Sequence, residues 1–197
     1  MSRRSVLLPF LAALALAVVA VVQLATGDAR AQVTESAIED YAGWDPQSTC
    51  RPQAKPGTKV LGRWIVRSQG GAFGGISRSC KHGGTSEHKE GRAFDWTLDA
   101  TKKRDRQRAV SFLRLVRASD QAGNTDARAR RMGIMYVIWN DHMYSAWDQF
   151  ERQPYLPSSC PSKKKCSKTA RHRDHMHISL SRPGGRGKTS WYDGRPS

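Results

Sequence analysis

The chain of 197 residues has few acidic side chains and a modest apolar content. It contains 17 Asp and Glu against 33 Lys and Arg, which gives a formal net charge of +16, and 38% of its residues are hydrophobic. This length suffices for one domain with a single core but not comfortably for two. The low apolar fraction, with abundant Arg, Lys, Gly and Ser, favours a loop-rich α+β domain over a helical bundle.

Several sequence patterns are missing, and each absence argues against a class of protein. The four cysteines show no Cys-x-x-Cys spacing, which argues against a structural zinc site built from thiolates. There is no recognition-helix, zinc-finger or stacking-platform pattern, so we expect no nucleic-acid partner. No internal repeat is evident. The positive charge instead predicts attraction to anionic wall polymers or lipid head groups, which salt should weaken.

The N-terminal segment, residues 1–31, has the features of an export signal. Two early arginines precede an apolar stretch from Val6 to Ala25, and the segment ends in Ala-Arg-Ala, which fits the small-x-small pattern of signal peptidase sites. We expect either cleavage after Ala31 or, because about 20 apolar residues can span a bilayer, an uncleaved membrane anchor. Both alternatives predict a secreted or cell-envelope protein.

An exported chain with an even number of cysteines is expected to form disulfides. Three pairings of the four cysteines exist. Pairing Cys50 with Cys80 and Cys160 with Cys166 closes the shortest loops and is the arrangement we expect. By loop entropy the short bridge should stabilise the fold by about 2 kcal/mol and the longer one by about 4 kcal/mol.

The rest of the chain divides into three parts. Residues 32–56 carry few apolar positions and are expected to form a tether, residues 57–182 the main domain, and residues 183–197 a loose basic tail. Within the domain, residues 59–66 are rich in β-formers and predict a first strand. Apolar residues at helical spacing predict a helix over 104–118.

The second half of the domain is expected to contain a short helix and a hairpin. A short basic helix ending at Met132 is expected after an N-cap at Asn124 or Thr125. Residues 133–139 predict a buried strand, and Asn140-Asp141 predicts a turn into a return strand over 142–147.

Two distant segments, 86–96 and 172–178, carry most of the residues suited to chemistry. His88 and Asp95 would lie roughly 10 Å apart in a helix, too far to share one metal ion, so we predict a loop to His88, a turn at Gly91 and a strand over 93–98. In the second segment, period-2 alternation places His175 and His177 on one face of a strand. Together the imidazoles and carboxylates suit a catalytic zinc site with three protein ligands and an open position.

The pattern Ser-x-His-x-x-Gly-x-Ala-x-Asp, followed by Asp-His-x-His, resembles the zinc D,D-carboxypeptidases and related peptidoglycan peptidases that share a core with the Hedgehog signalling domain. This resemblance assigns the zinc ligands to His88, Asp95 and His177. It assigns the general base to Asp174, where some branches have Glu, and this role requires the strand to begin at His175. His175 would help to hold the substrate or the transition state, and His172 is a weaker candidate for the same role.

The same resemblance implies an upstream arginine that holds the substrate carboxylate. Arg78 is our choice because a neighbouring disulfide could fix it, and Arg67 is the alternative. The sequence His-Lys-Glu-Gly-Arg-Ala-Phe-Asp-Trp more closely resembles secreted actinobacterial envelope domains whose substrates are mostly unassigned. We therefore expect a small antiparallel sheet carrying a zinc site, flanked by helices and stabilised by disulfides.

Two functions fit these observations. The first is zinc-dependent hydrolysis of amide bonds in the cell-wall peptide by a monomeric D,D-carboxypeptidase or endopeptidase. The second is a non-catalytic envelope module that keeps the fold and binds anionic wall polymer through its basic surface. A pure binder has no need of a general base, so the presence of Asp174 favours the enzyme.

Overall fold

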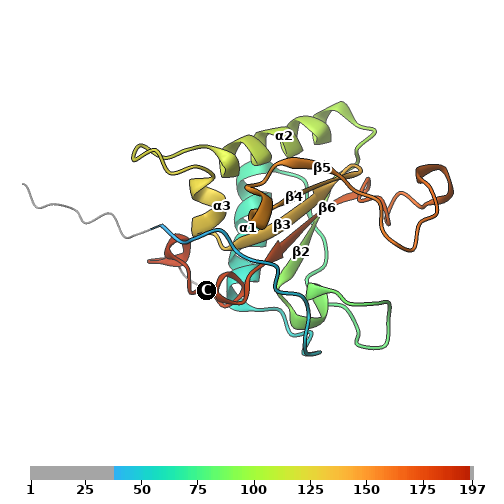
Figure 1. The fold of residues 1–197 in the computed structure, drawn as a ribbon, viewed down its shortest axis with the longest axis horizontal. Helices are drawn as coiled ribbons and strands as arrows, with labels where there is room; N and C mark the ends of the chain where they lie inside the picture. The colour runs from blue at the N-terminus through green and yellow to red at the C-terminus, as the bar shows by residue number, and fades with distance from the viewer. Residues whose placement is uncertain (1–37, 196–197) are drawn as a thin grey trace, which may run out of the picture. The chain divides into compact units, whose positions relative to one another are not determined.

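The computed structural model describes residues 38–195, which form an α+β domain (Figure 1). In these residues six strands make one sheet of order β1-β2-β6-β3-β4-β5, and every neighbouring pair is antiparallel. The strands are β1 Ala72–Phe73, β2 Ala93–Thr97, β3 Ile134–Trp139, β4 His142–Ser145, β5 Arg152–Pro154 and β6 His175–Leu180. The predicted α+β class with an antiparallel sheet is confirmed.

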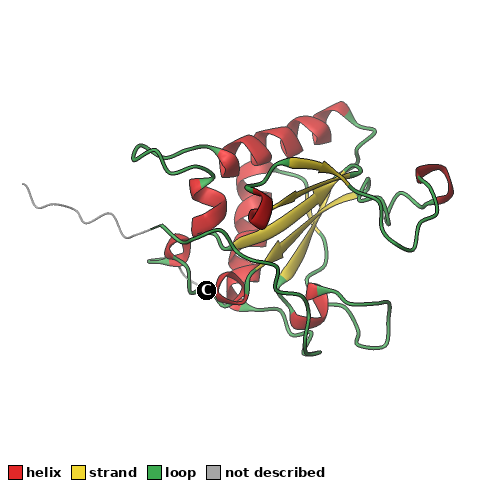
Figure 2. Ribbon diagram, viewed as in Figure 1, coloured by secondary structure: helices red, strands yellow, loops and turns green. Residues whose placement is uncertain are grey.

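Helices and short 3₁₀ turns surround this sheet (Figure 2). The helices are α1 Pro56–Gln69, α2 Lys103–Arg117, α3 Ala127–Arg131 and α4 Arg182–Gly185. The 3₁₀ turns are η1 Glu87–Glu90, η2 Ala146–Asp148, η3 Lys163–Lys165 and η4 Ser190–Tyr192. No helix within residues 38–195 is long and apolar enough to cross a membrane. The predicted signal peptide or anchor lies outside the described residues.

Alternation along the central strands separates the two faces of the sheet. Met176, Ile178 and Leu180 of β6 are fully buried in the main core, together with residues of β2, α1 and α2. In the view of Figure 1, α1 lies behind the sheet and α2 above it. The intervening residues of β6, His175 and His177, face the opposite side because successive side chains of a strand point in opposite directions. The helices thus cover one face and leave the other for the site.

The strand predicted over residues 59–66 is wrong, because this segment forms part of the 14-residue helix α1. Leu61 and Ile65, four residues apart, are both fully buried, which is the spacing of one helix face. Pro56 stands in the first turn, where its missing N–H is tolerated, and Gly70 ends the helix with a positive φ of 75°. Burial of one face and favourable helix ends outweigh the β-propensity of the individual residues.

Other predicted elements are confirmed with shifted boundaries. The helix expected over 104–118 is α2, and the buried strand expected over 133–139 is β3. Asn140 and Asp141 form the hairpin turn with positive φ angles of 48° and 65°. The return strand β4 ends at Ser145, and η2 follows where strand was expected. The N-cap of α3 is Asp126, so the prediction of Asn124 or Thr125 is wrong.

The segments expected to be a tether and a tail differ from expectation where the structure describes them. Backbone N–H groups of Arg51 and Lys55 donate to the carbonyl oxygens of Lys89 and Gly91, at 2.7 and 2.9 Å. After Ser181 the chain forms α4 and η4 and buries Trp191. Hydrogen bonds and an aromatic anchor therefore hold both segments against the domain.

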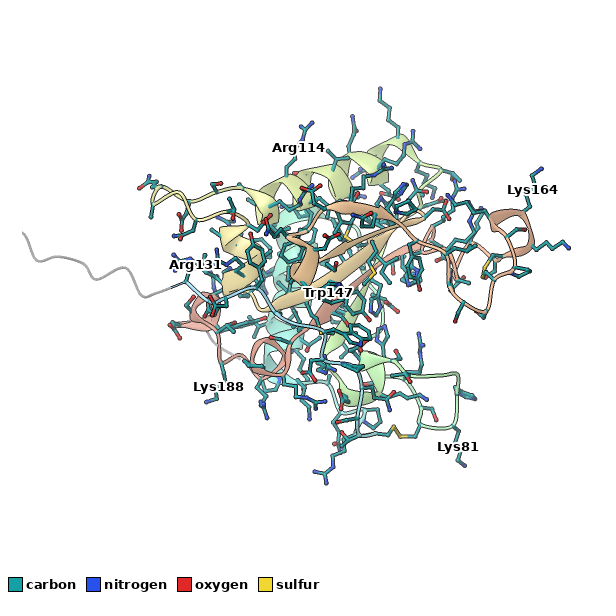
Figure 3. All side chains as sticks on the ribbon, viewed as in Figure 1. Lys81, Arg114, Arg131, Trp147, Lys164 and Lys188 are labelled. Carbon is teal, nitrogen blue, oxygen red and sulfur yellow. A yellow bond between two sulfur atoms is a disulfide. The ribbon has the colours of Figure 1, made fainter. Side chains whose placement is uncertain are left out.

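Both expected disulfides are present. Cys50 pairs with Cys80 across 30 residues, and Cys160 pairs with Cys166 across six. The first bridge ties the N-terminal segment to the loop that precedes η1. The second closes a basic loop, whose Lys164 projects outward in Figure 3.

Candidate metal site and cleft

Three side chains from the two predicted segments converge on one point. His88 Nε2, His177 Nδ1 and Asp95 Oδ1 form a triangle in which each pair of atoms is 3.1 Å apart. The centre of such a triangle lies about 1.8 Å from each corner, and zinc binds nitrogen and carboxylate ligands at about 2.0–2.2 Å. The three side chains would therefore be close enough together to hold one ion.

Sheet register and one tight turn produce this convergence. Asp95 of β2 lies directly opposite His177 of β6, so their side chains share a face of the sheet. His88 lies in η1, which ends at Gly91 in the left-handed conformation with φ of 66°. His88 Nδ1 lies 2.8 Å from the carbonyl oxygen of Ile76, which fixes the orientation of the ring. This second contact is typical of metal-binding histidines.

The proton inventory of the triangle favours a cation. The Ile76 carbonyl can only accept, so in the neutral His88 ring Nδ1 carries the proton and Nε2 presents a lone pair. Burial raises the pKa of the Asp95 carboxyl, but its contacts with the side chains of His177 and His88 outweigh burial and lower it, which keeps Asp95 ionised. Burial lowers the pKa of His177. If both rings are neutral, at most one proton is available for the three contacts among His88 Nε2, His177 Nδ1 and Asp95 Oδ1. A metal ion would instead accept a lone pair from each of these three atoms.

Asp174 and His175 form a hydrogen-bonded pair beside the triangle. Strand β6 begins at His175, so Asp174 lies in the preceding loop, as its expected role requires. Asp174 Oδ1 lies 2.7 Å from His175 Nδ1, and Asp174 Oδ2 accepts from the Thr169 hydroxyl. His175 Nε2 lies 3.7 Å from Asp95 Oδ1. The carboxylate thus holds the Nδ1 proton of His175 and presents the other ring nitrogen toward the triangle.

His172 joins this group as a neutral ring. Its centroid lies 4.8 Å from that of His175, 5.6 Å from that of His177 and 5.3 Å from that of Tyr155. Burial, reinforced by the neighbouring imidazoles, lowers the pKa of His172 to about 3. A histidine that stays neutral near pH 7 cannot provide positive charge to an oxyanion.

A cleft of about 400 Å³ opens beside these residues and contains the expected arginine. Arg78 lines the cleft together with His172, His175 and His177, whereas Arg67 lies on the exposed side of α1 and is not among the lining residues. The remaining walls come from residues near η1, from β3 and from both ends of the Cys160–Cys166 loop: Thr85, Ser86, Glu87, Tyr136, Ile138, Tyr155, Pro157, Ser167, Thr169 and Ala170.

Sequence reasoning missed a buried polar network behind the triangle. Glu87 is 2% exposed and accepts hydrogen bonds from the hydroxyl groups of Tyr136 and Ser179. The Tyr136 ring stacks on His177 at a centroid distance of 5.5 Å. Glu87 precedes a proposed ligand, and Tyr136 lies in a strand expected to be buried, so sequence position gave a weak signal for the first and none for the second.

Comparison with known proteins places the chain in a family. Residues 50–172 match the family model described as "VldE, C-terminal domain". This segment contains Arg78, His88 and Asp95 and ends before Asp174. No curated protein matches the chain, and no solved structure matches it. Because the matched residues make up more than half of the sequence, the chain belongs to the VldE C-terminal domain family.

Proposed function

We propose that this protein is a zinc-dependent hydrolase of amide bonds in cell-wall peptides. The observation that carries this proposal is the triangle of three potential metal-ligand atoms beside the Asp174–His175 pair, together with the cleft that His175 and His177 line. Two imidazoles and one carboxylate make up the ligand type of catalytic zinc sites that keep a position open. A metal-binding role for His88, Asp95 and His177 is part of the proposal.

A zinc ion held there supplies Lewis-acid polarisation of a carbonyl and lowers the pKa of a bound water toward about 7. The protein must then accept a proton and deliver it to the leaving amine. His175 Nε2 faces the triangle, and Asp174 Oδ1 holds the proton on Nδ1 of the same ring. We assign proton transfer to this pair: His175 Nε2 takes up the proton, and Asp174, the expected general base, acts through the ring by holding the proton on Nδ1.

Arg78 provides the positive group for a substrate carboxylate. It lines the cleft, and its backbone N–H donates to the carbonyl oxygen of His88 at 3.3 Å, while Cys80 two residues later is tied to Cys50. A guanidinium binds a carboxylate through paired hydrogen bonds, which suits the free end of a peptide. Together with the expected export and the charge of +16, this favours an anionic wall peptide as the substrate.

Digestion of purified peptidoglycan by the zinc-loaded protein tests the proposal, with products identified by mass spectrometry. Asp174→Asn keeps the three proposed ligands and should retain zinc, yet reduce hydrolysis by about 10²–10⁴-fold through loss of acid–base catalysis. Asp193→Asn is the matched control, because Asp193 is exposed and does not line the cleft. Its rate should equal that of the wild type.

Two outcomes would contradict the proposal. An active wild type whose rate is unaffected by Asp174→Asn would remove this residue from the mechanism. A zinc-loaded wild type that releases no product from any wall fragment would favour the alternative, a non-catalytic envelope module that binds anionic wall polymer.

A further inference from the structure

A second cavity, of about 360 Å³, shares no lining residue with the cleft. We call it the basic pocket, because five of its seven lining residues are cationic. The lining residues are Thr49, Arg51, Lys55, Glu90, Arg92, Arg182 and Arg186. The volume falls at the lower end of the range for small-molecule sites, about 300–1,000 Å³.

Two of the five cations are already balanced by carboxylates. Glu90 accepts from Arg92 Nε at 2.7 Å and from Arg182 Nη1 at 3.1 Å. Arg182 Nε lies 3.1 Å from a carboxylate oxygen of Asp45, and Arg92 Nη2 lies 3.9 Å from Glu87 Oε1. These pairs form a rigid base for the pocket, since the Glu90 and Arg92 side chains are only 4% and 3% exposed.

The other three cations have no such partner. The side chains of Arg51, Lys55 and Arg186 make no ion pair and no side-chain hydrogen bond within residues 38–195. Nevertheless their backbones are fixed. Arg51 follows the bridged Cys50, Lys55 donates to the Gly91 carbonyl, and Arg186 donates to the Arg182 carbonyl.

Three uncompensated charges around one cavity repel one another, and a bound anion would relieve this repulsion. Lys55 is also the N-cap of the 14-residue helix α1, and no side chain caps that end. The positive end of the helix dipole therefore adds to the field of the three side chains. One carboxylate carries a single negative charge, whereas a phosphate group carries up to two and offers several acceptor oxygens to guanidinium groups.

We propose that the basic pocket is a binding site for a phosphate-bearing ligand. The site is separate from the proposed metal centre and does not depend on hydrolysis. Pyrophosphate is the probe that best matches the charge of the pocket, and poly(glycerol phosphate) represents a phosphodiester polymer. Citrate, which has similar charge but only carboxylates, tests whether the phosphate group itself is recognised.

Calorimetric titration of the full chain at about 0.15 M salt tests the proposal under physiological screening. Arg51→Gln with Arg186→Gln should weaken pyrophosphate binding by at least about 30-fold, because two charge-assisted contacts are lost. Arg63→Gln with Arg67→Gln is the matched control. These arginines are exposed on α1 and lie outside both cavities. Their substitution removes the same amount of charge, so the affinity for pyrophosphate should change less than about twofold.

A titration in the presence of a metal chelator separates the pocket from the metal centre, because pyrophosphate also binds metals. The proposal is supported if pyrophosphate still binds in the presence of the chelator and binds more weakly to the Arg51→Gln, Arg186→Gln variant. Whichever of pyrophosphate and poly(glycerol phosphate) binds more tightly identifies the source of the phosphate group. Three results would overturn it: no binding by the wild type, equal losses in both double variants, or citrate binding as tightly as either phosphate probe.

Discussion

Protonation of His172 should destabilise the folded protein at mildly acidic pH. The ring packs among Tyr155, His175 and His177, and its Nδ1 atom is buried without a hydrogen-bond partner among the described residues. Burial is the main cause that lowers the pKa of His172 from 6.5 to about 3. Because the folded pKa is lower than the unfolded one, the unfolded chain binds the proton more tightly.

The sign and size of the effect follow from this difference. The stability contribution is fully present above pH 6.5 and is lost as the pH falls toward 3. One pKa unit corresponds to about 1.4 kcal/mol, so the free energy of unfolding should fall by about 2 kcal/mol between pH 7 and pH 5 through this residue.

His172→Asn isolates the contribution. The His172 backbone has a φ of 50°, a conformation that Asn tolerates well, and Asn does not titrate. Urea unfolding should be followed at several pH values in excess chelator, so that loss of metal does not contribute. The wild type should lose about 2 kcal/mol more than the variant between pH 7 and pH 5.

His82→Asn is the matched control, because His82 is exposed in the loop before η1. The free energy of unfolding of this variant should depend on pH in the same way as that of the wild type. Equal pH slopes for wild type and His172→Asn, within about 0.5 kcal/mol, would refute the assignment of a buried neutral ring.

Two further changes test the site and its support. His177→Ala removes one of three proposed ligands, so zinc occupancy by metal analysis should fall from about one per chain to near zero. His142→Ala is the control, because His142 lies outside the cleft, and it should keep full zinc occupancy. Full zinc occupancy in His177→Ala would exclude the assigned ligand set. Gly91→Ala should destabilise the fold by at least about 3 kcal/mol in urea unfolding, because a Cβ there meets the backbone of Gln53 and Ala54. Gly83→Ala has the same φ constraint without a neighbour and should cost only about 1–2 kcal/mol, so equal losses would contradict the steric explanation.

Local sequence patterns predicted how each of the two candidate segments folds, whereas the meeting of the two segments was expected only from the family resemblance. His175 and His177 lie two residues apart, and strand periodicity alone puts them on one face. The turn at Gly91 and the strand of Asp95 follow from glycine and β-former positions in the same short segment. Each of these inferences needs only a few neighbouring residues.

Features that depend on distant contacts could not be predicted in this way. Residues 59–66 contain β-formers, and the choice of helix depends on burying Leu61 and Ile65 against the sheet. The tail looked polar because its glycines and arginines outnumber Trp191 and Tyr192, yet these two aromatic residues pack in the core. Composition averages over such anchors, whereas tertiary packing depends on them.

The apolar core also explains how the proposed ligand set is kept together. Phe94 pairs with Ile178 across β2 and β6, and both are fully buried, while the adjacent pair, Asp95 with His177, faces the cleft side. A register slip of one residue would place His177 in the core and Ile178 at the site. Such a slip is unfavourable because it would also move the other buried apolar side chains of the strand out of the core. Two of the three proposed ligands are therefore aligned by hydrophobic alternation. His88 depends instead on the turn at Gly91 and on the Ile76 carbonyl, so η1, and not the register of the sheet, sets its position relative to the other two residues.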